Sequence, residues 1–145
     1  MSIADRSART VWEGSIAAGS GSVTSSSGAL GTLPVTWASR TEAPGGKTSP
    51  EELLAAAHSS CFSMALAVTM GEKKLRPSSL DVSATVSLEE VDGKPTITTS
   101  AITVVGSVEG VDEAGFQAIV DDAAALCPVS RLFAGATITV EASLA

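Results

Sequence analysis

Five side chains in this sequence of 145 residues are candidates for chemistry. The chain has two cysteines, Cys61 and Cys127, and a single histidine, His58. A thiolate is both a nucleophile and a metal ligand, and its reactivity depends on the charges around it. The charged candidates are Arg40, which precedes a glycine-containing loop, and Glu51, which begins a long uncharged segment. Cysteine-based catalysis and metal binding are therefore the two kinds of chemistry to weigh.

The two cysteines occupy different settings in the sequence. Cys61 lies in the middle of an uncharged segment, where a free cysteine is commonly a small core residue. Cys127 directly precedes Pro128, a residue that favours a helix start, and the partial positive charge of a helix N-terminus favours a reactive thiolate. The residues alone leave both interpretations open, because Cys61 could be plain core and Cys127 a plain helix cap.

His58 lies three residues before Cys61, so the two side chains share one face of a helix. This spacing allows a cysteine–histidine nucleophile or a pair of metal ligands. Two cysteines and one histidine are too few for a closed structural zinc site without carboxylates. We therefore expect neither a metal nor another cofactor, and we favour a hydrogen-bonded core histidine.

The charged candidates also have ordinary interpretations. Arg40, which we expect at the end of a strand, could be a solvated surface charge. Glu51 and its neighbour Glu52 could simply complement the positive end of a helix dipole.

Residues 48–71 form the element that must position several of these candidates. Ser49 as N-cap, Pro50 at the first helical position and Glu52 three residues after the serine predict a helix start, and Gly71 suits the turn after a helix. Between these signals 18 consecutive residues carry no formal charge. A helix this neutral is predicted to be buried on nearly every face. A membrane span of minimal length is less well supported, because no aromatic belt flanks the segment.

Hydrophobic periodicity and turn signals predict the remaining elements. We expect an α+β fold in one domain over residues 1–145, with residues 1–8 as a flexible tail. Antiparallel N-terminal strands precede the long central helix, and a second antiparallel sheet with one or two further helices follows it. The expected strands lie at residues 10–16, within 18–27, and at 30–37, 80–88, 95–108 and 137–143; the expected helices are 112–126 and a short one from Pro128 to near 135; Asp92-Gly93 is the expected hairpin turn.

Composition excludes several classes of partner. A net charge of −7 argues against nucleic acid and against anionic membrane surfaces. The first residues contain no apolar stretch of the signal-peptide type. We therefore expect a cytoplasmic protein whose thiols are free or redox-active, not joined in a permanent disulfide.

Several motifs occur together over nearly the whole chain. They are WEGSI, the segment 40–54, PEELLAAAHSSCFSMAL, the hairpin DVSATVSLEEVDG, and CPVS 66 residues after Cys61. In this combination the sequence resembles the OsmC/Ohr family of thiol-dependent hydroperoxide reductases, and its OsmC branch more than Ohr. Two positions depart from the family pattern: Thr41 stands where an aromatic is usual, and Ser49 where an asparagine is usual.

The resemblance implies a role for each candidate. Cys61 corresponds to the peroxidatic cysteine, Cys127 to the resolving cysteine, and Arg40 and Glu51 to the arginine and glutamate of the site. A guanidinium that stays protonated can hold a thiolate and polarise a peroxide, and a bidentate carboxylate can fix it. The implied activity, in oxidative or osmotic stress defence, reduces organic hydroperoxides to alcohols through a Cys61 sulfenic acid and a Cys61–Cys127 disulfide.

Helix geometry adds a prediction about assembly. Glu51 and Cys61 are ten residues apart on the expected helix, about 15 Å along its axis, so they cannot meet within one straight helix. An antiparallel helix from a second copy would close this gap, with the two-fold axis near Ala56. We expect an intertwined homodimer with sites at the subunit interface, a small-molecule hydroperoxide as substrate and an external dithiol, of lipoyl type by resemblance, as reductant. The alternatives are a redox sensor, a small-ligand-binding dimer or a purely structural dimer without turnover.

Overall fold

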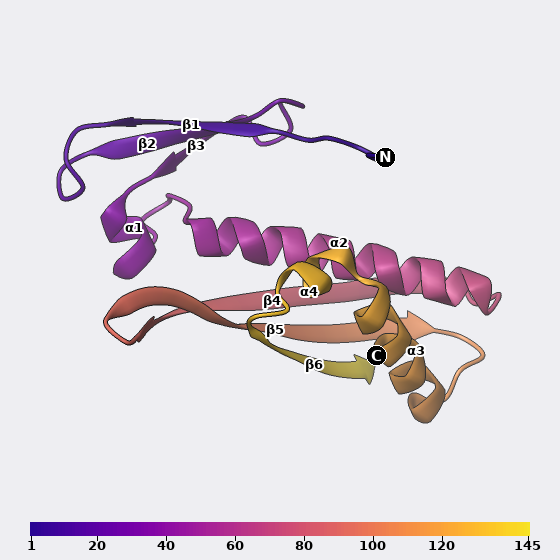
Figure 1. The fold of residues 1–145 in the computed structure, drawn as a ribbon. Helices are drawn as coiled ribbons and strands as arrows, with labels where there is room; N and C mark the ends of the chain where they lie inside the picture. The colour runs from indigo at the N-terminus through magenta and orange to yellow at the C-terminus, as the bar shows by residue number, and fades with distance from the viewer. The chain divides into compact units, whose positions relative to one another are not determined.

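The structure, a computed structural model, describes residues 1–145 and divides into two compact units, Met1–Leu53 and Leu54–Ala145 (Figure 1). The boundary between the units falls inside the long central helix. The α+β class, the N-terminal antiparallel strands and the long helix are confirmed. That residues 1–145 form a single domain stays a prediction.

The first unit is built on a three-stranded antiparallel sheet. Its strands are β1 (Ala8–Glu13), β2 (Ser20–Ser25) and β3 (Thr32–Val35), in that order across the sheet. The residues before Ala8 have no regular secondary structure. Of the large apolar side chains in these strands only Val23 is buried. The sheet therefore does not enclose a core of its own.

The third strand is shorter than predicted because a capping box follows it. The Thr36 side chain accepts a hydrogen bond from the Ser39 backbone N–H at 3.0 Å, and the Ser39 hydroxyl accepts one from the Thr36 N–H at 2.9 Å. This pair starts the short helix α1 (Trp37–Thr41). Arg40 therefore lies in a helix, and its expected place at the end of a strand is wrong.

The long helix α2 (Pro50–Glu72) begins as predicted, with the Glu52 N–H donating to Ser49 Oγ at 3.1 Å. Its length and apolar composition would allow it to cross a membrane, a criterion that core helices of soluble proteins also meet. The prediction of burial on nearly every face is wrong for the single chain, because one stripe of α2 is exposed. This stripe, called here the α2 stripe, consists of Ala56, Ala57, Ser60, Met64, Ala67, Val68 and Gly71.

The C-terminus of α2 also differs from the prediction. Gly71 remains inside the helix, and the left-handed residue is Lys74, with φ of 59°. The Leu75 N–H donates to the Met70 carbonyl at 2.9 Å, and the Lys74 N–H donates to the Gly71 carbonyl at 3.0 Å. This is the hydrogen-bond pattern of a Schellman motif, which satisfies the last carbonyls of the helix.

The second unit contains the other sheet, made of β4 (Pro77–Val91), β5 (Lys94–Val108) and β6 (Thr137–Leu144). Asp92 and Gly93 form the predicted turn of the long β4–β5 hairpin, with φ of 52° and 73°, as a type I′ turn requires (Figure 1). β6 pairs with β5 in parallel, so this sheet is mixed and not wholly antiparallel as expected. The crossover through two helices between β5 and β6 makes the parallel pairing possible.

Helix α3 (Glu113–Leu126) packs on this sheet. Its N-cap is Asp112, the first residue of the predicted helix, whose side chain accepts a hydrogen bond from the Gly115 N–H at 2.8 Å. Phe116 is buried, whereas Leu126, the last residue of the helix, is exposed. A Cβ at Gly106 of β5 would lie 2.6 Å from Phe116 Cζ, so only glycine admits this ring. The core of the unit contains Phe62, Ala65, Leu66, Met70, Ile102, Val104, Phe116, Ile119, Val120, Ala123 and Cys127.

Candidate active site

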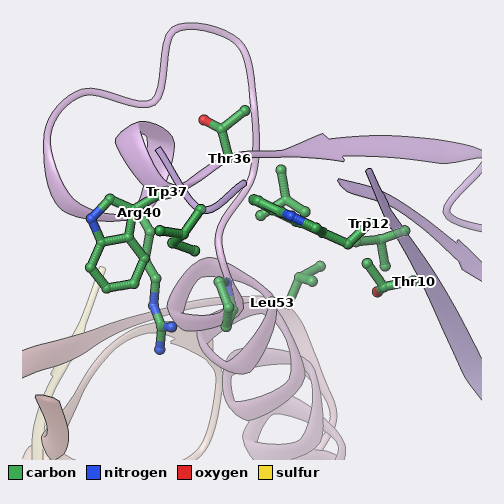
Figure 2. A pocket seen from close by; sticks show the side chains of 10 residues that line it. Thr10, Trp12, Thr36, Trp37, Arg40 and Leu53 are labelled. Carbon is green, nitrogen blue, oxygen red and sulfur yellow. The ribbon is translucent and has the colours of Figure 1, made fainter. Parts of the chain in front are cut away.

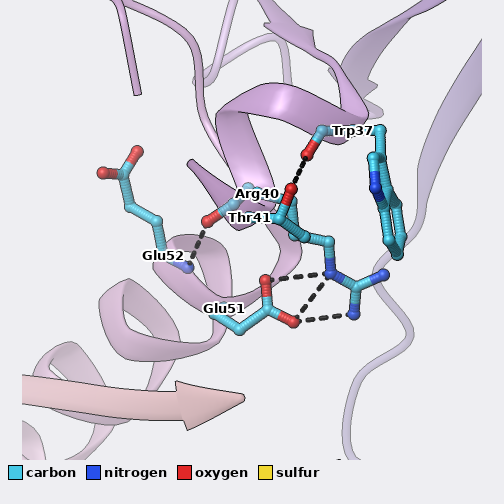
Figure 3. Close-up of polar contacts among 6 residues, drawn as sticks. Trp37, Arg40, Thr41, Glu51 and Glu52 are labelled. Atoms are coloured by element: carbon cyan, nitrogen blue, oxygen red, sulfur yellow. Dashed lines mark hydrogen bonds and ion pairs between the residues drawn. The ribbon is translucent and has the colours of Figure 1, made fainter. Parts of the chain in front are cut away.

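Arg40 and Glu51 form a bidentate ion pair in the first unit (Figure 3). Arg40 Nε lies 3.0 and 3.2 Å from Glu51 Oε1 and Oε2, and Arg40 Nη2 lies 2.7 Å from Oε1. The Glu51 side chain is 10% exposed and the Arg40 side chain 28%. Because the pair uses Nε and Nη2, Arg40 Nη1 is available to a further acceptor.

Hydrogen bonds around Thr48 hold the two partners of this pair in place. The Thr48 N–H donates to the Pro34 carbonyl at 2.9 Å, which ties the segment before α2 to β3. The Ser39 hydroxyl donates to the Thr48 carbonyl at 2.9 Å, which ties the same segment to α1. The start of α2, with Glu51, is therefore fixed against the helix that carries Arg40.

An apolar cavity of about 360 Å³ opens beside Arg40 (Figure 2). Arg40 is its only charged lining residue, and the ring of Trp37 lies 5.9 Å from the guanidinium carbon. The cavity can therefore take an apolar group beside a fixed cation. Its lining residues are Thr10, Trp12, Ile16, Val23, Val35, Thr36, Trp37, Arg40, Pro50 and Leu53.

The two cysteines lie close together in the core of the second unit, although they are 66 positions apart in the sequence. Both are free thiols; Cys61 is half-buried and Cys127 is fully buried. Burial raises the pKa of the Cys61 thiol, the backbone N–H of Val129 lowers it, and the hydrogen bond and charge of Cys127 raise it. Two adjacent thiols can be oxidised to a disulfide, but the raised pKa disfavours the reactive thiolate at Cys61.

The short helix α4 (Pro128–Leu132) positions Cys127. Cys127 is the N-cap, as predicted, and its carbonyl accepts the Arg131 N–H at 3.1 Å. Its thiol makes no capping bond to the helix backbone. The first N–H groups of a helix have no partner within it, and the N–H of Val129, which is one of them, lowers the pKa of the nearby Cys61 thiol.

His58 is a fully buried, hydrogen-bonded core residue, as favoured from the sequence. Its Nδ1 lies 2.6 Å from Ser100 Oγ and its Nε2 lies 2.8 Å from Ser130 Oγ. The rings of Phe62 and Phe133 lie 6.4 and 5.2 Å from the imidazole, measured between ring centroids. Burial lowers the pKa of His58, so the ring is neutral near pH 7.

The four predicted site residues thus fall into two pairs, Arg40 with Glu51 and Cys61 with Cys127, one pair in each unit. Their catalytic roles stay predictions. The sequence interpretation missed Ser130. This residue lies three positions after Cys127, just as His58 lies three positions before Cys61. It also missed the cavity, for which two tryptophans in an aromatic-poor chain were the available signal.

This chain is similar to known proteins in family, sequence and fold. The sequence matches the OsmC-like protein family over residues 43–143. It is 43% identical to the peroxiredoxin OsmC of Escherichia coli K12 over 133 residues, which cover 92% of each chain. It is 31% identical to an organic hydroperoxide resistance protein of Xanthomonas axonopodis over 94 residues, which cover 64% of each chain.

Solved structures agree with this match. The organic hydroperoxide resistance protein OhrB of Bacillus subtilis is 26% identical, with a TM-score of 0.69 over 96% of this chain and 98% of that one. An OsmC protein of Legionella pneumophila, 23% identical, has the same fold, with a TM-score of 0.75 over 100% of this chain and 99% of the other. By its family match, its sequence relatives and its fold, this chain belongs to the OsmC/Ohr family.

Proposed function

We propose that this protein is a cysteine-based peroxidase that reduces organic hydroperoxides to alcohols. The observation that carries the proposal is the proximity of Cys61 and Cys127, the two cysteines of the chain, within one buried core. Two neighbouring thiols can turn one oxidised sulfur into a disulfide without a large rearrangement. The names of the relatives, peroxiredoxin OsmC and organic hydroperoxide resistance protein, support this activity.

The proposed reaction has three balanced steps. The Cys61 thiolate attacks the terminal oxygen of the hydroperoxide, the O–O bond breaks, and the alkoxide takes a proton and leaves as the alcohol. Cys127 then attacks the Cys61 sulfenic acid, which releases water and forms the disulfide. An external dithiol, which we propose to be of the lipoyl type, reduces this disulfide by thiol–disulfide exchange and is itself oxidised.

Arg40 supplies what the cysteine pair lacks. Burial raises the pKa of Cys61, and a fixed cation is the direct way to offset this, because it stabilises the thiolate. The bidentate pair with Glu51 fixes the guanidinium and leaves Nη1 for the sulfur or the peroxide. The apolar cavity beside Arg40 suits the organic part of the substrate.

We propose that this cation serves Cys61 of a second copy of the chain. Glu51 and Cys61 are ten positions apart in the single helix α2, a rise of about 15 Å. In an antiparallel pair of α2 helices, position 51 of one copy is level with position 61 of the other when the two-fold axis passes near Ala56. With the axis there, the two helices overlap over positions 50–62, and the exposed residues of the α2 stripe in this span, Ala56, Ala57 and Ser60, are small enough for a close crossing. The result is a homodimer with two equivalent sites.

Steady-state turnover of cumene hydroperoxide with dihydrolipoamide tests the proposal, with the Cys61→Ser/Cys127→Ser double variant as control. We expect sustained alcohol formation by the wild type and none by the double variant. If the wild type forms one disulfide per chain but never turns over with any dithiol, the protein is a redox sensor and the proposal is wrong. A cytoplasmic location stays a prediction from the sequence.

A further inference from the structure

A hydrogen bond between His58 and Ser130 joins the same two helical segments that carry the two cysteines. His58 lies three residues before Cys61 on α2, and Ser130 lies three residues after Cys127 at α4. Residues three apart share a helix face, so α2 and the segment of Cys127 and α4 meet through two pairs of residues, and the two segments run antiparallel there. One pair is Cys61 and Cys127, which lie close together. The other is His58 and Ser130, with His58 Nε2 2.8 Å from Ser130 Oγ.

The other side of the imidazole is anchored on the sheet. Nδ1 lies 2.6 Å from the hydroxyl of Ser100, which is in β5, the central strand of the second sheet. His58 and Ser100 are fully buried and Ser130 is 8% exposed. In the neutral ring one nitrogen donates to one hydroxyl and the other accepts from the second hydroxyl, so every buried polar atom is satisfied. A satisfied buried network of this kind fixes the relative position of the elements it joins.

We propose that His58 is a positioning residue that, through Ser130, holds α4 against α2 and so keeps Cys127 within reach of Cys61 during disulfide formation. The step concerned is attack of the Cys127 thiol on the Cys61 sulfenic sulfur with loss of water, so the inference rests on the proposed function. His58 does not itself contact the peroxide in this role. His58 instead raises the effective concentration of the Cys127 thiol at the Cys61 sulfur, a quantity that is set by geometry.

The chain offers a matched pair of variants. Ser130→Ala removes the hydrogen bond between the imidazole and α4, and Ser100→Ala removes the hydrogen bond between the same imidazole and β5, which carries no cysteine. Both leave one buried ring nitrogen unpaired, so their losses of folding stability should be similar. A purely structural role of His58 predicts the same redox behaviour for both variants, whereas a positioning role predicts a change in Ser130→Ala alone.

The measurement is the equilibrium between the Cys61–Cys127 disulfide and mixtures of reduced and oxidised dithiothreitol, read by alkylation and mass spectrometry on the full chain. We expect Ser130→Ala to lower the effective concentration of the thiol pair about tenfold, the size of effect that one hydrogen bond allows. Ser100→Ala should change it less than about threefold, and Ser130→Thr, which restores a hydroxyl, should return it close to the wild-type value. Urea unfolding of each variant checks that it is folded, and His58→Gln replaces Ser130→Ala in the comparison if that variant does not fold.

Each outcome of this experiment supports or overturns the positioning role of His58. Equal shifts in Ser130→Ala and Ser100→Ala, or no shift in either, would overturn the positioning role while leaving the peroxidase proposal intact. A wild type that forms no Cys61–Cys127 disulfide in any mixture would overturn the proposed function, and the positioning role with it. A shift confined to Ser130→Ala and reversed by Ser130→Thr supports it.

Discussion

The two units of this chain carry different halves of the proposed chemistry. The first contains a fixed charge, the Arg40–Glu51 ion pair, on a short helix beside an apolar cavity. The second contains the sulfur, Cys61 and Cys127, in a core where burial raises the pKa of the Cys61 thiol. A thiolate needs a cation, and a cation without a nucleophile does nothing to a peroxide. In the proposed mechanism, positioning the sulfur and supplying the charge are therefore separate tasks, one in each unit.

The units also differ in how far each can stabilise itself. The second has a continuous core contributed by α2, β5 and α3. In the first, Val23 is the only buried large apolar residue, while Val11, Trp12 and Trp37 are 42%, 39% and 39% exposed. A three-stranded sheet with so little buried apolar area needs another surface to pack on. The proposed second copy of the chain would supply it.

The largest expected effect comes from removing sulfur. Cys61→Ser should abolish peroxide reduction, because no other nucleophile replaces the thiolate. Cys127→Ser should allow one oxidation per chain and then stall or over-oxidise, because the sulfenic acid at Cys61 has no partner. Mass spectrometry after one equivalent of cumene hydroperoxide distinguishes the two. Trapping of a sulfenic acid on Cys127 in the Cys61→Ser variant, at the wild-type rate, would contradict the assignment.

The next effect tests whether charge and sulfur come from different chains. Glu51→Ala and Cys61→Ser proteins are each expected to be inactive, and mixing them under subunit exchange should restore activity. The mixed dimer has one intact site, made by Glu51 of the Cys61→Ser chain and Cys61 of the other. Because half of the dimers are mixed and each has one of two sites, roughly a quarter of wild-type activity should return.

The mirror-image control combines both changes in one chain. A Glu51→Ala/Cys61→Ser chain exchanged into wild-type dimers should inactivate both sites of each mixed dimer if the sites are shared. If each site lies within one chain, the same mixture would retain one site per mixed dimer, and the mixture of single variants would stay inactive. If subunit exchange is demonstrated and this pattern is found, each site lies within one chain, and the proposal that charge and sulfur come from different chains is wrong.

A smaller effect is expected from Arg40→Lys. Lysine keeps the charge but loses the planar fork that binds Glu51 through Nε and Nη2 while offering Nη1 to the substrate. We expect a loss of at least about tenfold in kcat/KM, which corresponds to about 1.4 kcal/mol. Arg9→Lys, on exposed β1, is the matched control and should have no effect. Near-normal activity of Arg40→Lys would reduce Arg40 to a general electrostatic role.

Local signals predicted the elements that local interactions determine. The Ser49-Pro50 start of α2, the Asp92-Gly93 turn and the Asp112 cap of α3 each depend on hydrogen bonds or dihedral angles within a few residues. The five-residue helix that carries Arg40 was missed, because its capping box uses a serine at the third position instead of the usual glutamate or glutamine.

Non-local contacts were beyond these signals. The parallel pairing of β6 with β5 and the meeting of the two cysteines both join segments far apart in the sequence. The resemblance to a family supplied the cysteine pairing, and periodicity could not have done so. The predicted burial of α2 was too extensive because an uncharged stripe can equally face a second copy of the chain. Hydrophobic patterning alone does not distinguish the core of a single chain from an interface between two copies.

The smallest effect expected here is confined to the second unit and concerns its stability in acid. Burial lowers the pKa of His58 below its ordinary value of about 6.5. Below that pH the His58 imidazole is protonated in the unfolded chain but still neutral in the folded chain. The free energy of unfolding therefore falls as the pH drops toward the pKa of His58 in the folded state. Above about pH 6.5 both states are neutral at this residue, and its contribution to stability is complete.

His58→Gln removes this titration but keeps a polar side chain. The variant should be less stable than wild type at pH 7.5, by about 1 kcal/mol for a lost hydrogen bond, and should lose less further stability between pH 6.5 and 5. Urea unfolding across this range, as the difference between the two proteins, cancels the carboxylates that titrate in both. Ser100→Ala, which retains the imidazole, should keep the wild-type slope. An identical slope in His58→Gln and wild type would mean that the acid sensitivity arises elsewhere, and that the uncharged core around the cysteines does not depend on a neutral His58.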